Sequence, residues 1–158
     1  MARAKFPIIV LPGLAAVVAI GAGLVARARR AAWTASGIAG LLVGLVGLTV
    51  WIAPDLWIGL FTQNATVRAA ARSYFAWAGA AYGFFGLGVC LYFASQGAAK
   101  VGGPVMAGTV RLVMVLVGGW WLASSGAELW TLFALVAASM TVYGLLSIAA
   151  VRFTSWGD

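Results

Sequence analysis

The sequence contains very few groups that carry charge or acid–base chemistry. Among its 158 residues there are no histidines, one cysteine and three acidic residues, and charged residues make up only 8% of the chain. A soluble domain usually has about 25% charged residues, so this chain cannot cover a water-facing surface of its own. One cysteine excludes an internal disulfide. The lack of histidine and the scarcity of acids exclude most metal centres and most acid–base catalysis. We therefore expect no enzyme, no metal site and no cofactor.

Long apolar runs are what the sequence has in abundance. Hydrophobic residues make up 64% of the chain, and an apolar run of about 20 residues is long enough to cross a bilayer as a helix. The runs are apolar on all sides and do not alternate as the strands of a membrane β-barrel do. We predict an all-α membrane protein, a single domain over residues 1–158 built as a bundle of four to five transmembrane helices in a lipid bilayer. The approximate spans are 6–26, 33–54, 74–98, 104–123 and 129–151.

The first run leaves two interpretations open. It follows a short basic start, as the apolar part of a cleaved secretory signal peptide does. It is also long enough to span the membrane, although Pro7 and Pro12 would shorten or kink a helix there. We prefer a weak first spanning helix over the signal peptide.

The basic residues indicate an orientation. The net charge is +7, but most Lys and Arg residues lie between the apolar runs, which is typical of membrane proteins and not of nucleic-acid binding. With five spans, a basic turn at Arg27–Arg30 lies on the same side as Lys100 and Arg152. The positive-inside rule then places the Arg27–Arg30 turn in the cytoplasm and the loop from Asp55 to Arg72 outside a plasma (inner) membrane.

Polar residues on the expected outer side have ordinary structural interpretations. Asn64 or Thr66 is suited to cap a helix that runs through Arg68 and Arg72. Asn64 to Thr66 also reads as a glycosylation sequon, but short sequons are common by chance and we favour the cap. Glu128 lies at a span boundary, where we expect a solvated helix end and not a proton carrier.

Small residues mark the helix faces that we expect to pack. The chain has 21 glycines, many of them inside the runs, and small residues allow helix backbones to approach closely in lipid. We predict that leucine at Gly40 and Gly44 disrupts assembly. The small-residue stripes are Ser36, Gly40, Gly44 and Gly47 in the second run, and Gly79, Gly83 and Gly86 in the third, where Cys90 is expected to be another packing residue.

A bulkier stripe of the third run is the candidate cavity wall. Its members are Tyr82, Phe85, Val89, Tyr92 and Gln96, and tyrosine faces with a glutamine amide are able to hold a flat cationic, drug-like molecule. The alternative, which we favour, is a lipid-facing or packing face with interfacial tyrosines.

Arg111 is the only charged residue inside a predicted span. An intramembrane charge is costly, so Arg111 should either reach the head groups or contact a substrate or an acidic partner. We expect the first and include Arg111 in the candidate cavity wall.

Several segments together resemble the C-terminal part of a multidrug and toxic compound extrusion (MATE) transporter. The segment Ile20–Arg30 resembles the turn before the third helix of each lobe of that family, and Leu60–Thr62 resembles its extracytoplasmic Leu-Phe-Thr motif. The segment Tyr92–Pro104 resembles the loop between the fourth and fifth helices, and the Trp33–Pro54 run also fits. The resemblance covers about residues 15–153.

The resemblance implies part of a secondary transporter. Family members have two six-helix lobes and export cationic amphipathic drugs in exchange for protons or sodium ions, and this chain corresponds to the last four helices and a remnant of the one before. The family's coupling acids have no counterpart here, because Asp55 and Glu128 are the only acids between Trp33 and Val151. We therefore expect a chain that is incomplete alone and works as a homo-oligomer or with a partner chain that supplies the missing helices. The alternative is a small structural or accessory membrane protein without a transport cycle.

Overall fold

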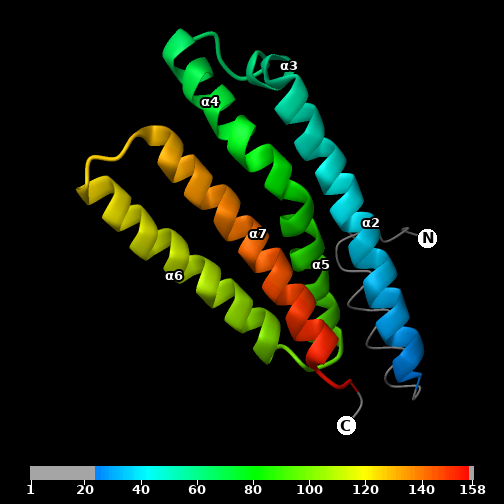
Figure 1. Ribbon diagram of the computed structural model, residues 1–158. Coiled ribbons are helices and arrows are strands. Elements are labelled where there is room, and N and C mark those ends of the chain that lie inside the picture. Colours follow the sequence, from blue (N-terminus) through cyan, green and yellow to red (C-terminus); the bar gives the residue numbers. More distant parts are fainter. Residues whose placement is uncertain (1–23, 157–158) are drawn as a thin grey trace, which may run out of the picture.

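The computed structural model of the protein describes residues 24–156. Within this range the regular structure is entirely helical, which confirms the predicted all-α membrane bundle (Figure 1). The elements are α2 (Val25–Ile52), α3 (Pro54–Ile58), α4 (Ala65–Ala78), the 3-10 helix η1 (Gly79–Ala81), α5 (Tyr82–Gly97), α6 (Gly102–Ser124) and α7 (Leu129–Phe153).

Four helical segments within the described residues are long and apolar enough to cross a membrane. The second of them combines α4, η1 and α5 into one run of 33 residues. The four segments are Val25–Ile52, Ala65–Gly97, Gly102–Ser124 and Leu129–Phe153.

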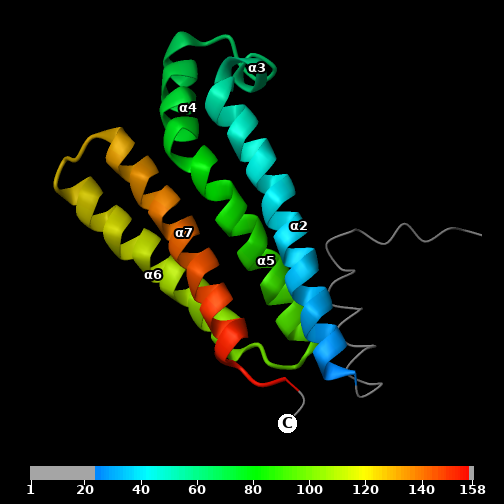
Figure 2. The same cartoon turned by 45° about the vertical axis from the view of Figure 1, so that its right-hand side comes forward.

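The long helices lie side by side in the order α2, α5, α7, α6 (Figures 1 and 2). Helix α5 packs between α2 and α7, while α6 packs mainly on α7 and only slightly on α5. The start of α2, the α5–α6 connection and the end of α7 meet at one end of the bundle. We call this the basic end, because it carries Arg27, Arg29, Arg30, Lys100 and Arg152.

The basic end is fastened by packing and by one arginine. Arg29 donates hydrogen bonds to the carbonyl oxygens of Val151, at 3.0 Å, and Arg152, at 2.6 Å. These carbonyls belong to the last turn of α7, where a positive charge is favourable to the helix dipole. A cluster of buried apolar residues lies beside this contact and is formed by Ala28, Ala32, Leu91, Ala94, Ala98, Val151 and Trp156.

The expected turn at Arg27–Arg30 is wrong. These residues form the first part of α2, which begins at Val25 and runs for 28 residues. Alanine and arginine are both good helix formers, and arginine at the end of a spanning helix can keep its charge at the membrane surface. The expected span 6–26 lies almost wholly outside the described residues.

Two other boundaries differ from the predicted spans. Helix α2 ends at Ile52, because Pro54 starts the short helix α3 at a position where proline is well tolerated. The span predicted at 74–98 begins earlier, at Ala65. Asn64 caps it, since the Asn64 side chain accepts hydrogen bonds from the backbone N–H groups of Thr66 and Val67 at 3.0 and 3.3 Å. The cap predicted from the sequence is therefore Asn64 and not Thr66.

Candidate functional site

The glycines of α2 and α5 meet where these helices cross. A Cβ atom on Gly44 would lie 3.4 Å from the Cα atom of Gly83, and one on Gly40 would lie 3.2 Å from the Gly83 carbonyl oxygen. A Cβ atom on Gly47 would collide with the Gly79 carbonyl oxygen. The two backbones approach so closely because these positions have no side chain.

The remaining small residues lie close to the same crossing. Ser36 is fully buried, and its hydroxyl has no hydrogen-bond partner among the described residues. A Cβ atom on Gly86 would lie 2.7 Å from the Cβ atom of Val43. Cys90 is a buried free thiol, as expected of a packing residue.

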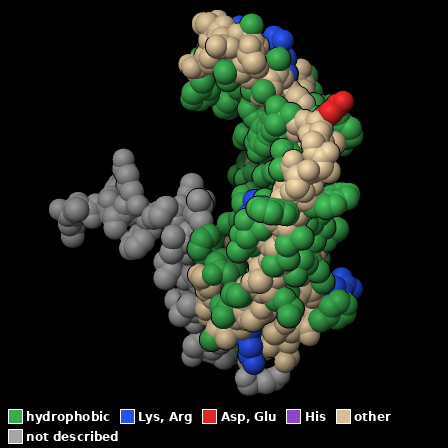
Figure 3. Space-filling model, turned by 90° about the vertical axis from the view of Figure 1, so that its left-hand side faces the viewer, with side chains coloured by type: hydrophobic (Ala, Val, Ile, Leu, Met, Phe, Trp, Pro, Cys, Tyr) green, Lys and Arg blue, Asp and Glu red, His purple; other side chains and the backbone are tan. Residues whose placement is uncertain are grey.

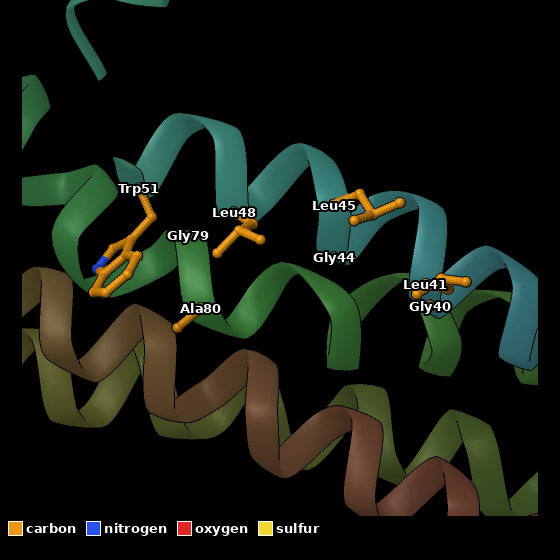
Figure 4. Close-up of a pocket in the computed structure, with 8 residues that line it drawn as sticks. All are labelled: Gly40, Leu41, Gly44, Leu45, Leu48, Trp51, Gly79 and Ala80. Carbon is orange, nitrogen blue, oxygen red and sulfur yellow. The ribbon is translucent and has the colours of Figure 1, made fainter. Parts of the chain in front are cut away.

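An apolar groove of about 390 Å³ runs along this crossing (Figure 4). None of the four expected wall residues lines it. Its lining consists of aliphatic side chains, backbone and the indole of Trp51, and it includes no charged side chain. Its lining residues are Gly40, Leu41, Gly44, Leu45, Leu48, Trp51, Gly79 and Ala80.

Three helices bring together a second group, which we call the arginine cluster: Arg111 of α6, Phe85 of α5 and Tyr143 of α7. The guanidinium carbon of Arg111 lies 4.8 Å from the centroid of the Phe85 ring, within the range of a cation–π contact. The Phe85 and Tyr143 rings are 5.8 Å apart and inclined at 46°. Tyr143 is buried, so the cluster forms part of the contact between helices.

The arginine cluster lies near the middle of the spanning helices. At 1.5 Å per residue, Arg111 is about 13 Å along α6 from the basic end, Phe85 about 18 Å along α5 and Tyr143 about 15 Å along α7. The hydrocarbon layer of a bilayer is about 30 Å thick, so its midplane is about 15 Å from either edge. We expected the Arg111 side chain to reach the near head groups. It packs instead on an aromatic ring at mid-depth.

The other expected wall residues lie elsewhere on α5. Tyr82 is half-buried, and its Cβ atom would lie 2.9 Å from a Cβ atom placed on Gly47 of α2. Tyr92 is half-buried with its ring 5.7 Å from that of Phe93, and Gln96 is exposed near the basic end.

Sequence reasoning missed Tyr143 and gave Phe85 no role of its own. A tyrosine inside an otherwise apolar run is the signal that could have pointed to Tyr143. Its partners could not be found that way, because they depend on how three helices are aligned.

The opposite end of the bundle holds Asp55 and Glu128, together with Arg68 and Arg72. Asp55 accepts hydrogen bonds from Arg72, at 2.9 Å from its Nε atom, and from Arg68, at 3.1 Å. These hydrogen bonds, first from Arg72 and then from Arg68, hold the pKa of Asp55 below its ordinary value. The Asp55 contacts tie α3 to the first turns of α4.

Glu128 and two tryptophans occupy the same end. The Glu128 carboxylate is exposed and accepts a hydrogen bond of 2.7 Å from the indole N–H of Trp130. The Trp130 ring stacks on Trp77 with centroids 5.7 Å apart. Tryptophans at this position are typical of a membrane–water interface, where Glu128 can remain solvated.

The described residues offer no other chemistry of the usual kinds. They contain no group of three or more histidine, cysteine or acidic residues that could hold a metal ion. Across the described helices long enough to span the membrane there is no aspartate or glutamate. The charged group at mid-depth in this part of the chain is therefore a cation.

These features define a multi-pass integral membrane protein: four apolar helices, interfacial charges at both ends and one cation at mid-depth. The MatE family model matches residues 13–121, which is more than half of the chain. The chain belongs to the MatE family, whose members are membrane transporters and not enzymes. No curated protein and no solved structure matches it.

Proposed function

We propose that this chain is part of a MATE-type secondary transporter that exports cationic amphipathic compounds across the plasma membrane in exchange for protons or sodium ions. The observation that carries the proposal is the MatE match over residues 13–121, which includes α2 to α5 and most of α6. The apolar helical bundle supports it, because a transporter needs helices that cross a membrane, and four helices of the described residues are long and apolar enough to do so.

The lack of intramembrane acids supports the view that the chain works with further helices. A proton- or sodium-coupled transporter needs a titratable or coordinating group inside the membrane. The acids of the sequence are Asp55, Glu128 and Asp158, and none lies within a predicted span. A second copy would add only the same three, so the coupling group has to come from helices outside this sequence.

Helix α6 has a surface on which such helices could pack. Only 6% of its most apolar stretch is buried, against 44% for the segment that contains α5. Figure 3 shows the side of the bundle where α6 lies, and hydrophobic side chains dominate this face. Its large exposed side chains include Val105, Met106, Leu112, Val113, Leu116, Val117, Trp120 and Trp121.

Deletion in the native cell tests the function. Cells that lack the gene should lose uncoupler-sensitive efflux of a fluorescent cationic dye, and the restored gene should recover it. An unrelated host that expresses the chain alone should gain no efflux. Unchanged efflux after deletion would contradict the proposal and favour the alternative, an accessory membrane protein, for which the acid-free spans also speak.

We infer that the basic end faces the cytoplasm, because cytoplasmic ends of membrane proteins are rich in Lys and Arg. Single cysteines can test this, since the native Cys90 is buried. In intact cells a membrane-impermeant maleimide should label Ser125→Cys, at the opposite end, and should label Ser155→Cys only after permeabilisation. The reverse labelling pattern would contradict the orientation.

A further inference from the structure

We propose that Arg111 is the docking charge for a carboxylate on a transmembrane helix outside this sequence. The inference rests on the proposed function in one respect, namely that further helices join this bundle. It adds where one of them docks and which chemical group it brings.

The first step is that Arg111 lacks a counter-ion. Among the described residues no hydrogen bond or ion pair to Arg111 is present, and its Nε atom is buried without a partner. The Phe85 ring attracts the guanidinium through its quadrupole but neutralises no charge. A guanidinium at mid-depth in hydrocarbon requires an anion or water beside it.

The acids of this chain do not supply the counter-ion of Arg111. Asp55 already holds Arg68 and Arg72 at the far end of the bundle, and Glu128 lies at that same end beside Trp130. Asp158 follows the last span in the sequence. A second copy of the chain has the same acids at the same places, so a homo-oligomer does not supply a carboxylate at mid-depth.

Lipid head groups fit the position of Arg111 less well than a carboxylate on a neighbouring helix does. Phosphate groups lie outside the hydrocarbon layer, more than about 15 Å from the midplane. Arg111 has its guanidinium over Phe85, which is about 18 Å along α5 from the basic end. Since the side chain is held near the middle of the bundle, a carboxylate on a neighbouring helix fits its position better than a head group does. Arginine and carboxylate also form paired, charge-assisted hydrogen bonds that fix orientation.

The fourth step is that a helix can reach the site. Arg111 is only half-buried, and α6 makes few contacts with α5. The exposed residues Val110 and Leu112 flank Arg111 on α6 and give an incoming apolar helix a surface to pack on. The partner helix is thus apolar with one Asp or Glu near its middle.

A synthetic helix tests the docking directly. The probe is a leucine-based transmembrane peptide with one glutamate at its centre, and the matched probe has glutamine there. Energy transfer from the labelled full chain to each probe is measured in phosphatidylcholine vesicles over a series of pH values, because burial at the centre of a spanning helix raises the pKa of the glutamate carboxyl and pairing with Arg111 favours its ionised form. We expect the wild-type chain to bind the glutamate probe at least tenfold more tightly than the glutamine probe.

Variants connect this preference to Arg111. Arg111→Gln should remove the preference for the glutamate probe, and Arg111→Lys should retain part of it. Equal binding of both probes to the wild-type chain would overturn the proposal. The proposal would also be overturned if the preference for the glutamate probe survived Arg111→Gln. It would equally be overturned if Arg111 bound the head groups in vesicles rich in phosphatidylglycerol and the chain showed no preference for the glutamate probe.

The test remains decisive if a variant fails to fold, and it does not depend on transport. If Arg111→Gln does not fold, the two probes on the wild-type chain still decide the matter. Phe85→Leu, which keeps the charge but removes the ring, should weaken the preference without abolishing it. Since probe binding needs no transport, it can fail while dye efflux succeeds, and the reverse.

Discussion

At the scale of single residues, two helix ends with the same geometry differ in one side chain. Helix α5 ends with hydrogen bonds from Lys100 N to Ser95 O and from Ala99 N to Gln96 O, both 3.0 Å. This is the Schellman arrangement, in which the residue after the cap takes a left-handed conformation. Ala99 does so with φ of 54°, which is unfavourable for a residue with a Cβ atom. Helix α6 ends in the same way, but with Gly126 at the left-handed position with φ of 68°.

The pair makes a matched prediction. Ala99→Gly should raise the free energy of unfolding by about 0.5–1 kcal/mol, because relief of the left-handed strain exceeds the extra freedom that glycine has in the unfolded chain. Gly126→Ala should lower it by a similar amount, and nothing lies within 4 Å of the added Cβ atom to cause a clash. Thermal unfolding in detergent measures both, and equal signs for the two substitutions would contradict the explanation.

Asp55 predicts a dependence on acid. Its pKa is lowered in the folded chain by Arg72 and Arg68, so its contribution is complete above the ordinary carboxyl pKa of about 3.9 and is lost as the pH falls through the lowered value. Asp55→Asn should therefore melt slightly below the wild type at neutral pH, and the difference should close below about pH 4. The effect is small because the site is exposed, and salt should reduce it. A difference that grows in acid would refute this account.

At the scale of helices, the α2–α5 crossing tests whether the small-residue stripes hold the bundle together. A Cβ atom at Gly40 would lie 3.0 Å from Leu87, and one at Gly44 would meet the backbone of Gly83. Replacing both glycines with leucine should separate the helices and cost about 2 kcal/mol or more. The measurement is thermal unfolding by circular dichroism, with cross-linking between α2 and α5.

Gly37 is the matched control for this prediction. It lies on the exposed side of α2, and nothing lies within 4 Å of a Cβ atom placed there. Gly37→Leu should be neutral or stabilising, since glycine inside a helix costs about 1 kcal/mol. If the double variant and the control behaved alike, the crossing would not depend on the missing side chains.

The helices themselves could be predicted from the sequence, but their ends could not. Apolar runs of spanning length identify α2, α5, α6 and α7 because a lone charge is rare inside them. Arg27–Arg30 looked like a turn because charge is a poor guide to backbone conformation at a membrane surface, where a helix can continue into the head groups. The early start of α4 depended on the Asn64 cap, which the sequence indicated without fixing its position.

At the scale of the whole molecule, the family could be identified from the sequence but the arginine cluster could not. The motifs lie along one chain and can be compared directly. The contact of Arg111 with Phe85 depends on the alignment of α5 and α6, and that of Phe85 with Tyr143 on α5 and α7. No pattern within a single helix reports that alignment.

As the proposed part of a larger transporter, the molecule has a cation at mid-depth and no acid to titrate in the spans that the structure describes. Alternating access requires two bundles that move around a central site. The described residues form one bundle of helices, and the exposed surface of α6 is where we propose that further helices pack.

The most direct test is dye transport by the purified chain alone in sealed vesicles. An imposed proton or sodium gradient would drive a fluorescent cationic dye, with protein-free vesicles and an uncoupler as controls. We predict no gradient-dependent transport by the folded protein, because no predicted span contains an acid that could couple transport to an ion. Transport that depends on the imposed gradient, and that is abolished by an uncoupler for protons or by a sodium ionophore for sodium, would contradict this prediction and would show that this chain assembles a complete pathway by itself.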